Sequence, residues 1–118
     1  MIKNLSEKEY VELADAAEGQ TLDAVLCYSI PDEVPSSFSF EDRKEIFLWA
    51  LTKLLKDGRI KLAKHRAFLK GSVEEQVELF RKALPKTEAE IDDGLWFFDE
   101  RCPGGAVWVL SDGSLEWT

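Results

Sequence analysis

The sequence predicts an α+β fold in which N-terminal helices pack on a small C-terminal antiparallel β-sheet. Apolar residues recur at helical spacing through much of the first 85 residues, and serines typical of helix caps precede several of these stretches. The last 24 residues contain alternating apolar and polar positions around Asp112-Gly113, a pair typical of β-hairpin turns. A chain of 118 residues, 45% of them hydrophobic, suits one globular domain that spans residues 1–118.

Two helices are expected before the first proline. Ser6 and Glu9 have the spacing of a capping box, which predicts a helix over residues 7–18. Thr21 then stands where the cap of a second, shorter helix is expected, and Pro31 ends that helix because the residue before a proline disfavours helical geometry. The N-terminal third is therefore predicted to be helical.

The strongest helical pattern covers residues 40–57. Ser39 precedes it, and its apolar residues extend well beyond one narrow stripe, so we expect this helix to be central and packed on more than one side. A second capping box at Ser72 and Glu75 predicts another amphipathic helix over residues 73–84.

Two further stretches have the patterns of strands. Residues 59–64 alternate between apolar and basic side chains, which predicts a strand with one buried face that joins the sheet. Residues 95–98 are apolar at every position, which predicts a strand covered on both faces. The segment after Thr87 forms either one short helical turn or a loop.

The Asp112-Gly113 turn fixes the register of the last two strands in this interpretation. A two-residue type I′ turn there places Trp108 opposite Trp117. One face then carries Ala106, Trp108, Leu110, Leu115 and Trp117, and the other carries Val107, Val109 and Glu116. The simplest expectation is that the first face lies against the helices, so that the aromatic residues belong to the core.

The net charge of −8 is distributed unevenly along the chain. Residues 1–40 contain eight acidic and two basic residues, and residues 86–118 also contain eight acidic and two basic residues. Residues 41–85 contain seven acidic and eleven basic residues, so the middle of the chain is basic. One interpretation is that the ends fold against the middle and partly neutralise it. The other is an acidic surface that meets a basic partner, where such charge steers association and adds specificity.

No residue pattern indicates catalysis, a metal site or a cofactor, and we predict that the protein is not an enzyme. His65 lies in a basic stretch without an evident catalytic companion. Cys27 and Cys102 match no metal-ligand or redox spacing, and we expect them to be reduced thiols. One cluster of carboxylates lacks the spacing of a calcium loop and is typical of a solvated turn: Glu88, Glu90, Asp92 and Asp93.

The basic stretch over residues 53–70 supports an alternative function. A regulatory or accessory domain could contact nucleic acid or another anion there, through Lys61, Lys64 and Arg66, because phosphate contacts dominate such affinity. The acidic balance of the whole chain and the position of the aromatic residues elsewhere in the sequence both disfavour this alternative.

Three stretches carry a resemblance to a known family: FLWALTKLLKDGRIKLAK, GSVEEQVELFRKALP and WFFDERCPGGAVWVLSDGSLEWT. They resemble small bacterial proteins of the domain-of-unknown-function family five-nine-six, well over residues 40–118 and more loosely before them. The resemblance implies that members of that family are encoded by orphan genes near those of large secreted toxins of the contact-dependent or polymorphic type. The resemblance implies an immunity protein that binds and neutralises a cognate toxin domain, but it supplies no motif of assigned functional residues.

The leading hypothesis is therefore an acidic, non-enzymatic protein–protein interaction module whose partner is a basic toxin domain. No apolar run has the length of a signal peptide or a membrane span, so we expect a cytoplasmic protein. Exposed acids near the C-terminal hairpin supply the contacts, with Trp96 or Trp117 as an aromatic anchor. The predicted partner-binding residues are Asp92, Asp93, Asp99, Glu100, Asp112, Glu116 and Trp117.

Overall fold

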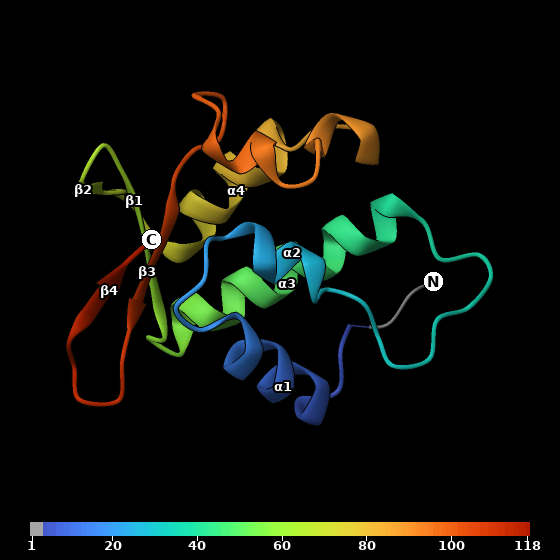
Figure 1. The fold of residues 1–118 in the computed structure, drawn as a ribbon, viewed down its shortest axis with the longest axis horizontal. Coiled ribbons are helices and arrows are strands. Elements are labelled where there is room, and N and C mark those ends of the chain that lie inside the picture. Colours follow the sequence, from blue (N-terminus) through green and yellow to red (C-terminus); the bar gives the residue numbers. More distant parts are fainter. Residues whose placement is uncertain (1–3) are drawn as a thin grey trace.

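A computed structural model describes residues 4–118 (Figure 1). The α-helices are α1 (Glu7–Ala17), α2 (Asp23–Cys27), α3 (Phe40–Lys56) and α4 (Val73–Ala83), and two 3₁₀ helices follow, η1 (Glu88–Ile91) and η2 (Leu95–Phe98). The strands are β1 (Ile60–Lys64), β2 (Ala67–Phe68), β3 (Gly105–Val109) and β4 (Leu115–Trp117). The predicted α+β class is confirmed.

The serine caps position the long helices as predicted. At the start of α1, the Glu9 backbone N–H donates to Ser6 Oγ over 3.1 Å, and the Glu9 carboxylate accepts from the Ser6 backbone N–H over 2.8 Å. The same reciprocal bonds open α4 at Ser72 and open α3 at Ser39. Thr21 does not cap α2, because Leu22 occupies the N-cap position and no side chain caps this helix; the Thr21 hydroxyl donates to the Asp23 carboxylate.

Helix α3 is the centre of the hydrophobic core, as its wide apolar surface predicts. Phe47 and Leu51 in this helix are fully buried. The Phe47 ring meets Phe80 of α4 at 6.2 Å and Phe97 of η2 at 5.9 Å between ring centroids, both edge to face. Helix α3 therefore ties α4 and η2 to one core.

The four strands form one antiparallel sheet in the order β2-β1-β3-β4, with β1 and β3 in the middle. The sheet lies at one end of the molecule, and the helices cover one of its faces (Figure 1). On that inner face Ile60 and Trp108 are paired and buried. The Trp108 indole N–H donates to the Gln20 carbonyl over 2.8 Å, which ties the sheet to the segment between α1 and α2.

The predicted strand at residues 95–98 is wrong, because this segment forms the 3₁₀ helix η2. The Phe97 N–H donates to the Gly94 carbonyl over 3.1 Å, so the chain coils instead of extending. Trp96 and Phe97 are buried, whereas Leu95 and Phe98 are 62% and 66% exposed. A run of four apolar residues does not distinguish a buried strand from one helical turn.

The predicted register of the last hairpin is wrong by one residue. Trp117 pairs with Val107, and Trp108 pairs with Glu116. The loop has three residues, Ser111–Gly113: the Gly113 N–H donates to the Leu110 carbonyl, and the Leu110 N–H donates to the Ser114 carbonyl. Positive φ occurs at Gly113 (87°) but not at Asp112, so the turn is not type I′.

This shift separates the two tryptophans. Trp108 lies in the core with no exposed surface, whereas Trp117 is 45% exposed on the outer face of the sheet. Leu115 lies on that outer face with Trp117 and is 41% exposed. The expectation that both residues belong to the core with Trp108 is therefore wrong, because a one-residue change of register reverses the face of every side chain.

Candidate functional site

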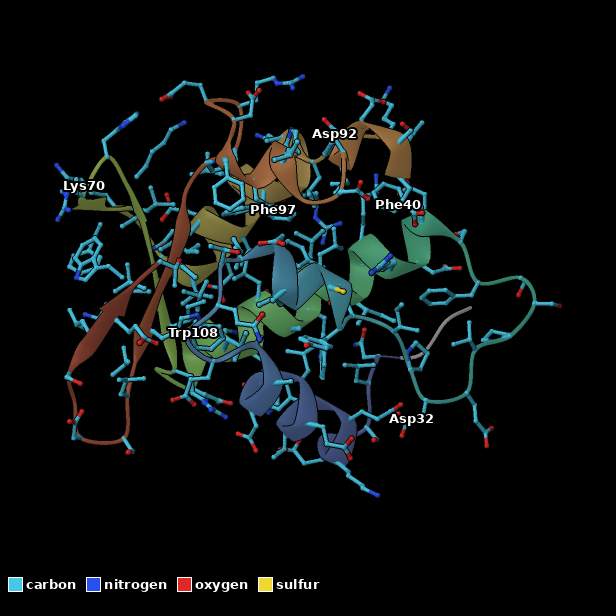
Figure 2. All side chains as sticks on the ribbon, viewed as in Figure 1. Asp32, Phe40, Lys70, Asp92, Phe97 and Trp108 are labelled. Carbon is cyan, nitrogen blue, oxygen red and sulfur yellow. The ribbon has the colours of Figure 1, made fainter. Side chains whose placement is uncertain are left out.

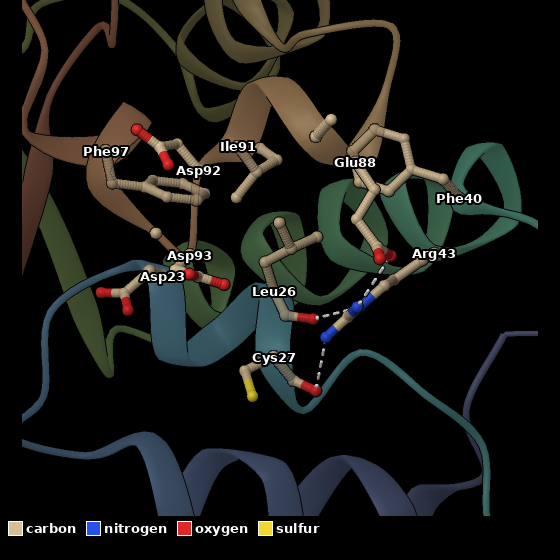
Figure 3. A pocket seen from close by; sticks show the side chains of 12 residues that line it. Asp23, Leu26, Cys27, Phe40, Arg43, Glu88, Ile91, Asp92, Asp93 and Phe97 are labelled. Carbon is tan, nitrogen blue, oxygen red and sulfur yellow. Dashed lines mark hydrogen bonds and ion pairs between the residues drawn. The ribbon is translucent and has the colours of Figure 1, made fainter.

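A cleft of about 610 Å³ opens between α2, the start of α3 and the segment that runs from η1 to η2 (Figure 3). Its walls combine acidic and apolar side chains. The carboxylates are Asp23, Glu88, Asp92 and Asp93, and the larger apolar residues are Leu26, Phe40, Ile91 and Phe97. We call it the acidic cleft.

Left-handed backbone geometry shapes the side of the cleft between η1 and η2. Asp92 and Asp93 have φ values of 53° and 54°, and Gly94 follows with 92°. Aspartate tolerates this region better than most residues, and glycine adopts it without strain. A Cβ atom on Gly94 would lie 2.8 Å from Asp23 Oδ2, so the absence of a side chain lets this turn approach α2 closely.

One cation faces the four carboxylates, and its donors are already engaged. Arg43 Nε donates to the Leu26 carbonyl over 3.0 Å, and Nη2 donates to the Cys27 carbonyl over 3.1 Å. Nη1 lies 3.5 Å from Glu88 Oε1 (Figure 3). Arg43 thus satisfies carbonyls at the end of α2, which leaves Asp23, Asp92 and Asp93 without a cationic partner among the described residues.

The arrangement suits a long cationic side chain. Phe40 and Phe97 come from α3 and η2, and together with Leu26 they give the cleft an apolar part. Lysine and arginine pack their methylene stems on apolar surface while their charged ends stay near water or carboxylates. The cleft therefore has the composition to bind a basic segment of another molecule.

The structure gathers only Asp92 and Asp93 of the predicted acidic residues in the cleft. Asp99 pairs with Arg101 at 2.9 Å, and this hydrogen bond holds the pKa of Asp99 below its usual value. Glu100 pairs with His65 at 2.7 Å and with Lys64 at 3.5 Å.

The other predicted residues lie in the last hairpin. Asp112 accepts hydrogen bonds from Ser114 in the three-residue loop. Glu116 and Trp117 are on β4, outside the cleft. The predicted set is thus spread over several parts of the surface.

Sequence reasoning missed Asp23 as a cleft residue. Asp23 belongs to the acidic N-terminal segment, whereas Glu88, Asp92 and Asp93 belong to the acidic C-terminal segment. The charge distribution was the available signal, because it marks both segments as acidic. It could not show that the two segments meet.

The described residues give no geometric support for metal or thiol chemistry. Within residues 4–118 no group of three or more His, Cys, Asp or Glu side chains is placed to hold a metal ion. Cys27 and Cys102 are both free cysteines, the first exposed and the second buried. Burial raises the pKa of the Cys102 thiol to about 11, which keeps it protonated at neutral pH.

The basic residues predicted for anion binding lie outside the acidic cleft, on the sheet and in the β1–β2 turn. Lys64 and Arg66 line a groove of about 360 Å³ that also contains Trp117 and Phe98. Lys61 lies on the outer face of the sheet, with its Nζ 5.2 Å from the centre of the Phe68 ring. Figure 2 shows Lys70, next to β2, far from Asp92 in the acidic cleft.

Fold and site together define a small α+β protein with an open acidic cleft at one place and an aromatic, basic surface at another. The chain belongs to the family described as "Protein of unknown function, DUF596", whose model matches residues 55–118, just over half of the chain. The resemblance stated from the sequence is confirmed in this respect. No helix among the described residues has the length and apolar character to cross a membrane.

A solved structure shows the same fold. It is described as an uncharacterised protein conserved in bacteria, from Neisseria meningitidis, and it is 28% identical to this chain. The match has a TM-score of 0.74 and covers 93% of this chain and 84% of the other. No curated protein matches this chain.

Proposed function

We propose that this protein is a non-enzymatic binding module that takes a basic segment of a partner protein into the acidic cleft. The observation that carries the proposal is the convergence of Asp23, Asp92 and Asp93 on a cleft with apolar walls. Arg43 is the one cation among the described residues that line it, and backbone carbonyls engage this side chain. A charged cleft of this kind attracts an oppositely charged partner before contact and selects against acidic partners.

The proposed partner is a bacterial toxin domain, which makes this protein an immunity protein that acts in the cytoplasm. The resemblance stated from the sequence, which implies a gene beside that of a secreted toxin, motivates this part of the proposal. Toxin domains that act on nucleic acid carry basic residues, and a basic segment of such a domain can enter the acidic cleft. The net charge of −8 supports this role.

Coexpression tests the proposal. The protein is produced together with the toxin domain encoded beside its gene, and growth and copurification are measured. We expect rescue of growth and a stable complex. If neither rescue nor a complex is found, the immunity function is excluded. If a complex forms without rescue, the protein binds the toxin domain but does not neutralise it.

Charge reversal in the cleft tests the location of binding. The variant Asp92→Lys/Asp93→Lys should lose rescue, because it places two cations where the partner's cation binds. Glu12→Lys/Glu33→Lys is the control for net charge, since both residues are exposed and lie outside the cleft. Asp92→Asn/Asp93→Asn is the control for backbone strain, because asparagine tolerates positive φ as aspartate does, and it should weaken rescue without straining the turn. Equal behaviour of the two lysine variants would place the binding surface elsewhere.

A further inference from the structure

The outer face of the sheet, which the helices leave uncovered, carries two exposed aromatic rings. Phe68 in β2 and Trp117 in β4 belong to the two edge strands, yet their ring centroids lie 5.2 Å apart with 31° between the ring planes. Val107, on β3, one of the two strands between them, is only 1% exposed. The rings meet above the central strands, and they remain 43% and 45% exposed themselves.

Exposed cations lie on the outer face of the sheet and at its β1–β2 end. Lys61 Nζ lies 5.2 Å from the centre of the Phe68 ring, Arg66 is exposed in the turn before β2, and Lys70 is exposed just after it (Figure 2). Within residues 4–118 no ion pair engages Lys61, Arg66 or Lys70, in contrast to Lys64, which pairs with Glu100. We call Lys61, Arg66, Phe68, Lys70 and Trp117 the aromatic basic face.

A groove of about 360 Å³ continues from this face along Trp117. Arg66 and Phe98 line it together with the backbone of Gly104 and Gly105. A Cβ atom on Gly104 would lie 2.9 Å from the Ala63 carbonyl oxygen, so a bulkier residue would disturb the strands that form the groove. The two acidic residues at the edge of the groove have basic partners: Glu100 pairs with Lys64 and His65, and Asp99 pairs with Arg101.

We propose that the aromatic basic face binds single-stranded nucleic acid, with bases stacked on Trp117 and Phe68 and phosphates paired with Lys61, Arg66 and Lys70. Aromatic rings beside cations are the combination that single strands require, since every base has a stacking surface and every nucleotide a negative charge. The basic stretch and Trp117 are far apart in the sequence, and the fold brings them together.

The charges on this face disfavour a second copy of the chain as its occupant. A two-fold interface pairs the same patch on both copies, which would bring Lys61, Arg66 and Lys70 against their own counterparts. The rings also lie against each other over Val107 instead of projecting from a loop tip, which favours stacking over insertion into a bilayer.

The test is fluorescence anisotropy with labelled oligouridylate of about 15 nucleotides, long enough for the strand to cover a typical single-strand site. We expect saturable binding at low salt. Trp117→Ala should weaken it about ten- to hundredfold, the range found for loss of one stacked base. Lys61→Gln and Arg66→Gln should each reduce the slope of log affinity against log salt by about 0.7, because each removes one phosphate contact.

Lys8→Gln/Lys86→Gln is the matched control, since both lysines are exposed and lie outside this face. This control should bind the oligonucleotide like the wild type. Asp92→Lys/Asp93→Lys should bind it as tightly as the wild type or slightly more tightly. That result separates this proposal from the function proposed for the acidic cleft. The proposal would be overturned if no RNA binding occurs at low salt, or if the control variant loses as much affinity as the face variants. It would also be overturned if the protein dimerises, or sediments with phosphatidylserine vesicles, and does not bind RNA. Thermal unfolding by circular dichroism checks that every variant is folded.

Discussion

The acidic cleft and the aromatic basic face differ in how the chain builds them. The cleft is bounded by α2, the start of α3 and the two 3₁₀ helices, and by a turn with left-handed backbone at Asp92, Asp93 and Gly94. The aromatic basic face is set by strand register, because the pairing of Trp117 with Val107 decides which side of the sheet the indole occupies. One surface therefore depends on backbone conformation at a few residues, and the other depends on pairing between strands.

The comparison also explains how opposite charges coexist in one small domain. The cleft draws its acids from both ends of the chain, whereas the face draws its cations from the basic middle segment. The acidic ends neutralise part of the basic middle, since Arg59 pairs with Asp15 and Glu18. The fold groups the charges into separate surfaces, which would allow two partners of opposite charge.

The two tryptophans of the last hairpin provide the largest expected effect. Trp108→Ala should lower the free energy of unfolding by about 3–5 kcal/mol, because it leaves a cavity beneath the sheet. Trp117→Ala should cost only about 1 kcal/mol, since the indole is 45% exposed. Urea unfolding followed by circular dichroism measures both values, and equal losses would contradict the observed register and the comparison built on it.

The two cysteines distinguish the surroundings of the cleft from those of the groove. Cys27 is exposed and lines the cleft, whereas Cys102 lines the groove and is 2% exposed with a pKa raised to about 11 by burial. We expect a thiol reagent such as DTNB at pH 8 to modify Cys27 about a hundredfold faster or more. Cys27→Ser should remove the fast phase, and a fast phase that survives this substitution would contradict the assignment.

Gly94 tests whether backbone conformation holds the cleft. Gly94→Ala should cost about 2 kcal/mol, because it combines the strain of positive φ with a contact to the Asp23 side chain. Gly58→Ala is the matched control: its φ is also positive, at 74°, but a Cβ atom there meets open space, so only about 1 kcal/mol of strain is expected. Thermal unfolding measures the difference, and a larger loss at Gly58 would argue against close packing of this turn on α2.

Substitution of Asp112 should have the smallest effect on stability and binding, because Asp112 lies outside both the acidic cleft and the aromatic basic face. Its hydrogen bonds from the Ser114 hydroxyl and backbone N–H lower the pKa of its carboxyl. A lowered pKa in the folded state stabilises the fold above the ordinary carboxyl pKa, and this contribution is lost as the pH falls through the lowered value. Asp112→Ala should slightly lower the urea midpoint at pH 7 and leave it unchanged at pH 2, without altering binding by either surface.

The helices could be predicted from the sequence because their signals are local. Ser6, Ser39 and Ser72 form caps with residues three positions later, so start sites were apparent without knowledge of the tertiary structure. The register of the last hairpin depended on whether Gly113 is the second or the third residue of the loop. Both loops accommodate the same Asp-Gly pair, and the three-residue loop has the left-handed residue at its last position.

The β1–β2 turn shows the opposite case. His65 and Arg66 have φ values of 52° and 66° and form a two-residue connection between Lys64 and Ala67. Neither residue is typical of such a turn, so no local pattern in the sequence indicates it. Tertiary contacts thus override local preference here, and they also bring Asp23 next to Gly94, an approach that no spacing in the sequence indicates.

The most direct test of the central proposal is the dissociation constant of the complex with the neighbouring toxin domain, measured by isothermal titration calorimetry. If the acidic cleft binds the toxin, Asp92→Lys/Asp93→Lys should raise this constant at least about thirtyfold, as expected when a close charge pair is lost. Glu12→Lys/Glu33→Lys should leave it within about threefold, because rim and distant charges mainly change the association rate. Equal changes in the two variants would contradict the proposed role of the cleft.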